Sequence, residues 1–173
     1  MIIHKIMSDN SEDHWPCINM ENKILLDLGC GRWDTYELCH SSPIYLGGLG
    51  ASKVYAIDAK ASEIAYFTEN NPDPEKYTFI NASVESSEQI KQWISDFNID
   101  YIKCDIEFYE KLFYPLTVED MKNIKEFAVE YHDLDIRDNF LKKFEEWGFT
   151  VHSEGKFTFL SGYEHMGVLF ASK

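Results

Sequence analysis

The chain has 173 residues, of which 45% are hydrophobic and 15% aromatic, and it suits one globular domain with a sizeable core. Its 30 acidic and 16 basic residues give a formal net charge of −14, which disfavours binding to nucleic acids or anionic membranes. The chain contains no apolar run of the roughly 20 residues that span a membrane, and residues 1–22 lack a signal-peptide pattern. We therefore expect a soluble, cytoplasmic protein with neither a nucleic-acid nor a membrane partner.

The cysteines show no C-x-x-C spacing that would indicate a zinc site or a redox motif. They stand at Cys17, Cys30, Cys39 and Cys104. This scatter predicts reduced thiols of an intracellular protein rather than a disulfide framework.

Residues 1–22 are mixed polar and aromatic, and we expect an arm or a short lid before one main domain at 23–173. Within that domain, short apolar runs alternate with helical patterns. Strands are predicted, in chain order, at 24–28, 53–57, 77–80, 100–104, 125–129, 149–152 with 156–160, and 166–171.

Two helices are marked by apolar residues spaced three and four apart. One carries its apolar face over 90–97 and begins with a capping box between Ser86 and Gln89. The other covers 136–147 and stops at Gly148. A third, shorter helix is predicted at 61–69, before the third strand.

Strands separated by helices predict an α/β fold: a single Rossmann-like domain with a seven-stranded, mainly parallel sheet and helices on both faces. The last two strands are separated only by the segment 161–165, which is too short for a parallel crossover. We therefore expect a C-terminal antiparallel hairpin. Gly47, Gly48 and Gly50 are interpreted as a helix-to-strand turn rather than a phosphate loop.

The strongest functional signal lies where the first two strands end. The first strand contains Asp27 and runs into Gly29 and Gly31, while the second ends on Asp58. A glycine turn after one parallel strand and a carboxylate at the tip of its neighbour form a nucleotide cleft, with the carboxylate on the ribose hydroxyls.

The third position of the dinucleotide fingerprint separates two cofactors. Where that fingerprint has its third glycine, beside a pyrophosphate, this chain has Asp34. A carboxylate there would repel NAD. S-adenosylmethionine carries a sulfonium, an ammonium and one carboxylate, so its net charge is positive and an acidic cleft suits it.

The later strand ends carry a resemblance to a known family. The segments are Phe79–Ser83, Tyr101–Glu107 with Glu110, and Phe127–His132. With the glycine motif, they resemble class I S-adenosylmethionine-dependent methyltransferases. They are similar in particular to the FkbM family, whose known members methylate hydroxyl oxygens, commonly on sugars and polyketides. The resemblance spans roughly residues 24–170.

Two positions depart from the family pattern. The first motif of the family usually reads D-x-G-A-N-x-G, whereas Cys30 and Gly31 follow Gly29 here. The family usually has a glycine after the position of Glu107, where this chain has Phe108. A bulky aromatic residue at that bend would reshape the acceptor pocket.

The resemblance implies a role for each donor-binding position. Gly29 and Gly31 would approach the methionine part of the donor, and Asp58 would bind the ribose. Ala82 and Ser83 would flank the adenine. The complete implied set is Asp27, Gly29, Cys30, Gly31, Asp58, Ala59, Ala82, Ser83 and Asp105, with Asp105 facing the transferable methyl group.

A hydroxyl is a poor nucleophile at neutral pH, so its methylation needs a base or a metal ion. The candidate catalytic residues are those at the ends of the fourth and fifth strands: Asp105, Glu107, Glu130 and His132. His132 is interpreted as either a general base or a turn residue. Carboxylates at these ends could hold Mg²⁺, but the cationic donor already gives an acidic cleft a purpose, so we assign no metal ligand.

The sequence thus predicts an S-adenosylmethionine-dependent methyltransferase acting on a hydroxyl of a sugar, glycan or small metabolite. Two alternatives are kept. One is a non-catalytic module that binds the same cofactor, and the other is a nicotinamide-dependent oxidoreductase. Aromatic residues that could stack on an acceptor are Trp15, Trp33, Tyr109, Phe113, Tyr114 and Tyr163, although core packing is the expectation for each.

Overall fold

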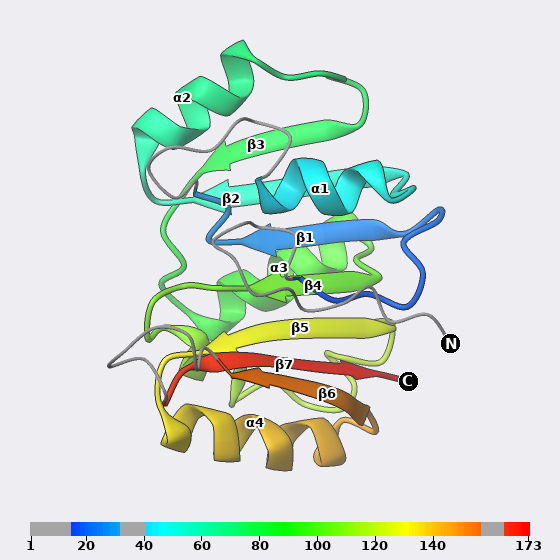
Figure 1. Cartoon of the computed structure of the whole chain (residues 1–173), viewed down its shortest axis with the longest axis vertical. Helices are drawn as coiled ribbons and strands as arrows, with labels where there is room; N and C mark the ends of the chain where they lie inside the picture. The colour runs from blue at the N-terminus through cyan, green and yellow to red at the C-terminus, as the bar shows by residue number, and fades with distance from the viewer. Residues whose placement is uncertain (1–14, 32–40, 157–164) are drawn as a thin grey trace.

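The structure is a computed structural model that describes residues 15–31, 41–156 and 165–173. Its elements follow the predicted alternation of strands and helices (Figure 1). In chain order they are β1 (Ile24–Leu28), α1 (Ser42–Gly48), β2 (Lys53–Asp58), α2 (Ala61–Glu69), β3 (Tyr77–Asn81), α3 (Ser87–Phe97), β4 (Tyr101–Cys104), the 3₁₀ helix η3 (Glu110–Phe113), β5 (Glu126–Tyr131), α4 (Leu134–Glu146), β6 (Thr150–Lys156) and β7 (Gly167–Ser172).

The strands form one seven-stranded sheet in the order β3-β2-β1-β4-β5-β7-β6. The strands from β1 to β5 pair in parallel, whereas β7 pairs antiparallel with both β5 and β6. The predicted parallel sheet and its antiparallel hairpin are therefore confirmed. Because the strand order reverses beside β1, the carboxyl ends of β1 and β4 flank the crevice in which such sheets bind ligands.

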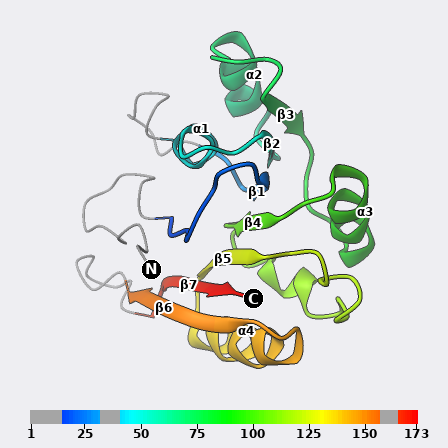
Figure 2. The same cartoon turned by 90° about the vertical axis from the view of Figure 1, so that its right-hand side faces the viewer.

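Helices cover both faces of the sheet (Figure 2). One face packs on α1 and α2, with Leu46 and Phe67 in its buried cluster. The opposite face packs on α3, η3 and α4, with Ile90 and Phe140 in a second cluster. Two separate apolar cores thus fix the sheet from both sides and leave the strand ends free to form a site.

The described part of the N-terminal segment packs against the α1 face. Trp15, Cys17 and Met20 are buried there. The hydroxyl of Tyr101 in β4 donates a hydrogen bond of 2.6 Å to the carbonyl oxygen of Pro16. Residues 15–20 therefore belong to a core of the domain, while 1–14 lie outside the described residues.

The strand expected in two pieces at 149–152 and 156–160 is continuous over Thr150–Lys156, so the predicted interruption is wrong. A register shift between Val151 and Ser153 marks a bulge at His152. Polar residues continue this strand because it lies at the edge of the sheet, where Glu154 accepts hydrogen bonds from Tyr131 and Arg137. Residues 157–160 lie outside the described residues.

The predicted start of α3 and the predicted end of α4 agree with the structure, except for one bond of the capping box. Ser86 Oγ accepts a hydrogen bond of 3.2 Å from the amide of Gln89, as the capping box predicts. The reciprocal bond, however, goes from the amide of Glu85 to Gln89 Oε1. Gly148, with φ +78°, ends α4 as expected. No helix in the described residues is long and apolar enough to cross a membrane.

Candidate active site

The turn after β1 has room only for a glycine at position 29. Gly29 has a φ of +76°, and a Cβ placed on it would lie 1.5 Å from the backbone oxygen of Asp105. Its amide donates a hydrogen bond of 2.9 Å to the carbonyl oxygen of Ile57 in β2. The turn therefore packs directly on the ends of both neighbouring strands, β2 and β4.

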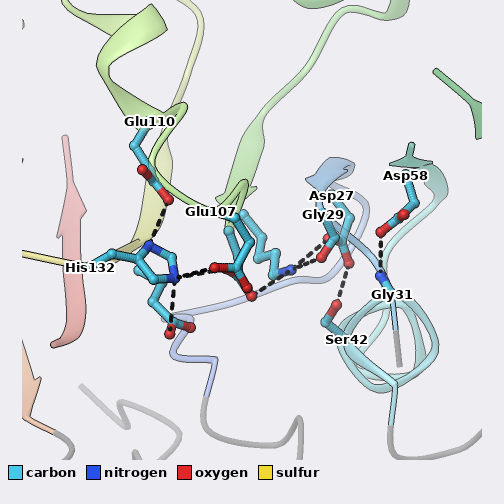
Figure 3. A network of polar contacts seen from close by, with 11 residues as sticks. Asp27, Gly29, Gly31, Ser42, Asp58, Glu107, Glu110 and His132 are labelled. Carbon is cyan, nitrogen blue, oxygen red and sulfur yellow. Dashed lines mark hydrogen bonds and ion pairs between the residues drawn. The ribbon is translucent and has the colours of Figure 1, made fainter. Parts of the chain in front are cut away.

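Asp58 is fixed at the tip of β2 by two backbone amides. Its Oδ2 accepts a hydrogen bond of 2.8 Å from Gly31, and its Oδ1 accepts one of 2.7 Å from Lys60. A carboxylate has about four lone-pair positions, so this one retains acceptor capacity for ribose hydroxyls. The link to Gly31 joins the two motifs that the sequence placed in one cleft (Figure 3).

A buried ion pair lies beneath the glycine turn. The ammonium of Lys103 lies 3.2 Å from Asp27 Oδ1 and donates a hydrogen bond of 2.6 Å to the carbonyl oxygen of Gly29. Asp27 Oδ2 accepts a hydrogen bond of 2.7 Å from Ser42 Oγ at the start of α1. Asp27 is fully buried, so it supports the turn from below and does not line the cleft.

A pocket of about 580 Å³ opens at these strand ends. Its walls come from the loops after β1, β2, β3 and β4. They are formed by Gly29, Ile57, Asp58, Ala59, Ala82, Ser83, Val84, Glu85, Asp105, Ile106, Glu107 and Tyr109. Six of the nine predicted donor-binding residues are among them. Of the other three, Asp27 and Cys30 are fully buried and Gly31 bonds to Asp58.

The four predicted catalytic side chains converge beside this pocket. His132 Nε2, at the end of β5, lies 3.3 Å from a carboxylate oxygen of Glu107. It lies 3.8 Å from an oxygen of Asp105 and also 3.8 Å from one of Glu130. The ends of β4 and β5 therefore bring three carboxylates to one edge of one imidazole.

Glu110 completes the cluster from the opposite edge of the ring. Its Oε1 lies 2.9 Å from His132 Nδ1, and its side chain is fully buried on η3. Sequence reasoning included Glu110 in the resemblance but gave it no role. Its position depends on the bend between β4 and η3, which no periodic pattern in the sequence indicates.

Two groups in the cluster have shifted proton affinities. Burial raises the pKa of Asp105 to about 6, although the nearby charges of Lys103 and His132 oppose that shift. Burial alone would lower the pKa of His132. The hydrogen bond and charge of Glu110, together with Asp105 and Glu107, outweigh burial and raise that pKa above its usual value.

The bend that follows β4 carries two consecutive residues in the left-handed region. Glu107 has a φ of +51° and Phe108 one of +74°. The bend leaves Phe108 and Tyr109 more than half exposed, with the Phe108 ring 5.1 Å from that of His132. Non-glycine residues rarely adopt this conformation, and it turns the Glu107 carboxylate back toward His132.

The remaining predicted aromatic residues divide between core and surface. Trp15 and Phe113 are fully buried, and the partly buried Tyr114 packs against the core. Tyr109 alone of the described set lines the pocket. Trp33, Tyr163 and the Asp34 that argued against NAD lie outside the described residues.

No protein-family profile matches this sequence, and no curated protein matches it. Solved structures nevertheless share its fold. A magnesium protoporphyrin IX methyltransferase from Synechocystis PCC 6803 with bound S-adenosylmethionine is 14% identical. Its TM-score is 0.59, and the match covers 90% of this chain and 72% of that one.

Two further solved structures show the same relationship. A precorrin-6y C5,15-methyltransferase from Geobacter metallireducens is 13% identical, with a TM-score of 0.57 and coverage of 90% of this chain and 84% of that one. An rRNA methylase from Streptococcus thermophilus is 12% identical, with a TM-score of 0.58 and coverage of 90% and 88%. The chain therefore has the Rossmann-like fold of class I S-adenosylmethionine-dependent methyltransferases.

Proposed function

We propose that this protein is an S-adenosylmethionine-dependent methyltransferase that acts on a hydroxyl oxygen. One observation carries the proposal: the pocket at the strand ends is lined by residues from each motif expected to hold the donor. In this proposal Gly29 forms the turn beside the methionine part of the donor, and the Asp58 carboxylate binds the ribose hydroxyls. Ala82 and Ser83 flank the adenine. Fold alone does not decide function, so the proposal depends on this pocket.

The charge of the pocket supports S-adenosylmethionine over NAD. Its described lining holds four acidic side chains, Asp58, Glu85, Asp105 and Glu107, and no lysine or arginine. A pyrophosphate would lie among these carboxylates without a compensating cation. The sulfonium and ammonium of S-adenosylmethionine would instead be attracted to them.

The cluster around His132 supports a hydroxyl acceptor. Transfer of the methyl group is an in-line displacement in which the acceptor oxygen bonds to carbon, the sulfur–carbon bond breaks, and S-adenosylhomocysteine leaves. The hydroxyl proton must pass to a nearby group, and Asp105, Glu107 and His132 are the acceptors beside the methyl-facing end of the pocket. Holding donor and acceptor in line supplies much of the remaining acceleration.

The acceptor class follows from the sequence resemblance and from the surface charge. FkbM enzymes commonly methylate sugars and polyketides, and exposed Phe108 and Tyr109 offer flat apolar surface beside carboxylates. The net charge of −14 disfavours a nucleic-acid acceptor. We therefore propose a glycan or small metabolite as the acceptor.

Thermal unfolding with separately added ligands tests the donor. S-adenosylmethionine and S-adenosylhomocysteine at about 100 times their dissociation constants should each stabilise the fold by roughly 2.7 kcal/mol. For a domain of this size the expected rise in Tm is on the order of 5–10 °C. NAD at the same concentration should give no rise. A rise with NAD alone would overturn the proposal, and donor binding without transfer across a broad acceptor screen would overturn the enzymatic part of it.

A further inference from the structure

We propose that Asp105, Glu107 and His132 form a binding site for a divalent first-row transition-metal ion. One ligand atom from each residue can be chosen so that all three lie within 4.8 Å of one another. Two of these residues follow β4 and the third follows β5, so adjoining parallel strands hold the set in place. Binding of the ion does not depend on the proposed methyl transfer.

The histidine is already held in the orientation that a metal ligand needs. His132 is 3% exposed, and its Nδ1 lies 2.9 Å from the buried carboxylate of Glu110. This contact leaves Nε2 as the ring atom that points to Asp105 and Glu107. Metal-ligating histidines commonly bond their second nitrogen to a carboxylate in this way, which fixes the tautomer and raises ligand basicity.

The carboxylates around the His132 ring favour a cation that carries more positive charge than a proton. Four carboxylates surround His132: Asp105, Glu107 and Glu130 near Nε2, and Glu110 at Nδ1. A protonated imidazole would supply one positive charge against four. The ammonium of Lys103 lies 3.9 Å from Asp105 Oδ2 and is shared with Asp27 at 3.2 Å. A divalent ion at Nε2 would bring two positive charges to these carboxylates, where a proton brings one.

The ligand types select the class of metal. Mg²⁺ and Ca²⁺ are held by oxygen ligands, whereas imidazole suits Fe, Zn and related transition metals. One imidazole with two carboxylates is a mixed set that suits Mn²⁺, Fe²⁺ or Zn²⁺. If the proposed function holds, the ion would lie beside the methyl-facing Asp105, where it would bind the acceptor hydroxyl and lower its pKa.

Titration of the metal-free protein with Mn²⁺ tests the site. Free Mn²⁺ gives an electron paramagnetic resonance signal that disappears on binding. We expect one saturable site, weakened at least about tenfold by Glu107→Gln and by Asp105→Asn. The matched control is Glu85→Gln, which removes an acidic side chain from the same pocket without touching the cluster and should leave Mn²⁺ affinity unchanged.

A second measurement detects metal binding at His132 by NMR and needs no substitution of that residue. Bound Mn²⁺ should broaden the side-chain NMR signals of His132 more than those of His152, which lies on β6. Mg²⁺ should bind more weakly than Mn²⁺ by about tenfold or more, because it gains little from the imidazole. No saturable Mn²⁺ binding up to about 1 mM would overturn the proposal. Equal losses in Glu85→Gln and Glu107→Gln, or equal affinities for Mg²⁺ and Mn²⁺, would also overturn it.

The same preparations separate this inference from the proposed function. Thermal stabilisation by S-adenosylhomocysteine in the presence of EDTA reports the donor pocket alone. Stabilisation without any Mn²⁺ binding would overturn the metal site and leave the donor assignment standing. Mn²⁺ binding without thermal stabilisation by S-adenosylhomocysteine would support the metal site and overturn the donor assignment.

Discussion

The ammonium of Lys103 lies 2.6 Å from the carbonyl oxygen of Gly29 and holds the turn after β1 against the end of β4. Lys103 is itself fully buried, with the ring of Trp15 4.7 Å from its ammonium and Asp27 beside it. The proposed donor-binding turn thus rests on a buried cation that the N-terminal segment and β1 enclose. Its geometry depends on the ion pair as much as on the glycine.

Removing the buried lysine should therefore cost more stability than removing a partly buried one. Lys103→Met leaves Asp27 buried without its partner, and we expect a loss of about 3–5 kcal/mol in the free energy of unfolding. Adding Asp27→Asn should recover part of that loss, since the amide can still accept the hydrogen bond from Ser42. Urea unfolding of the single and double variants measures both effects.

A partly buried lysine with the same kinds of contact, an aromatic ring and a carboxylate, provides the control. Lys143 packs over the Trp147 ring and bonds to Glu146 at 2.7 Å on α4. Lys143→Met should change the free energy of unfolding by less than about 1 kcal/mol. A loss equal to that of Lys103→Met would show that burial of the pair is not what matters.

Gly29→Ala and Gly148→Ala separate steric conflict from backbone strain. Both glycines have nearly the same positive φ, but a Cβ at Gly148 would meet nothing within 4 Å. Gly148→Ala should cost about 1–2 kcal/mol, the penalty of the left-handed backbone. Gly29→Ala adds a collision with the Asp105 backbone and should cost more and remove the Tm rise with S-adenosylhomocysteine. If Gly29→Ala keeps the full Tm rise, the turn is not part of the donor site.

The carboxylate of Asp58 should contribute charge as well as shape to donor binding. Asp58→Asn retains an oxygen that can accept from a backbone amide but loses the negative charge that strengthens hydrogen bonds from ribose hydroxyls. We expect S-adenosylhomocysteine to bind about tenfold more weakly, which corresponds to about 1.4 kcal/mol. Isothermal titration calorimetry measures the change.

Asp73→Asn is the matched control for Asp58→Asn. Asp73 also accepts hydrogen bonds from nearby backbone amides, those of Glu75 and Lys76, but it lies in the turn between α2 and β3. Its substitution should leave the affinity unchanged. An unchanged affinity in Asp58→Asn as well would remove Asp58 from the ribose site.

The sequence predicted what depends on local period and on parallel strand order. Strands β1 to β5 are short and mostly apolar, and the carboxyl ends of parallel strands meet at one edge of a sheet. That rule alone brings Asp58, Asp105 and His132 to the same side of the molecule. The helices at 90–97 and 136–147 were equally visible because their apolar faces repeat at helical spacing.

Features made by three-dimensional packing were not predictable in this way. Glu110 stands in an aperiodic bend, so only the fold reveals its contact with His132. Lys103 lies in the fully buried strand β4, where a lysine interrupts the apolar pattern and the sequence gives no sign of its partner. The continuous β6 escaped prediction because Ser153 and Glu154 are poor strand formers that an edge strand tolerates.

The buried thiols should react far more slowly in the folded chain than in the unfolded one. Cys17, Cys30 and Cys104 are buried and free. Burial raises the pKa of Cys17 to about 11 and those of Cys30 and Cys104 well above their usual range. Since the thiolate is the reactive form, a higher pKa lowers reactivity at any pH below it.

A Cys39→Ser variant makes the measurement clean, because Cys39 lies outside the described residues. At about pH 8, a thiol with a pKa near 11 is about one-thousandth thiolate. The folded variant should therefore release almost no chromophore from a disulfide reagent within minutes, and the variant in guanidinium should release three equivalents at once. Rapid reaction of one thiol in the folded variant would mean that Cys17, Cys30 or Cys104 reaches solvent, and the close packing around that cysteine would be wrong.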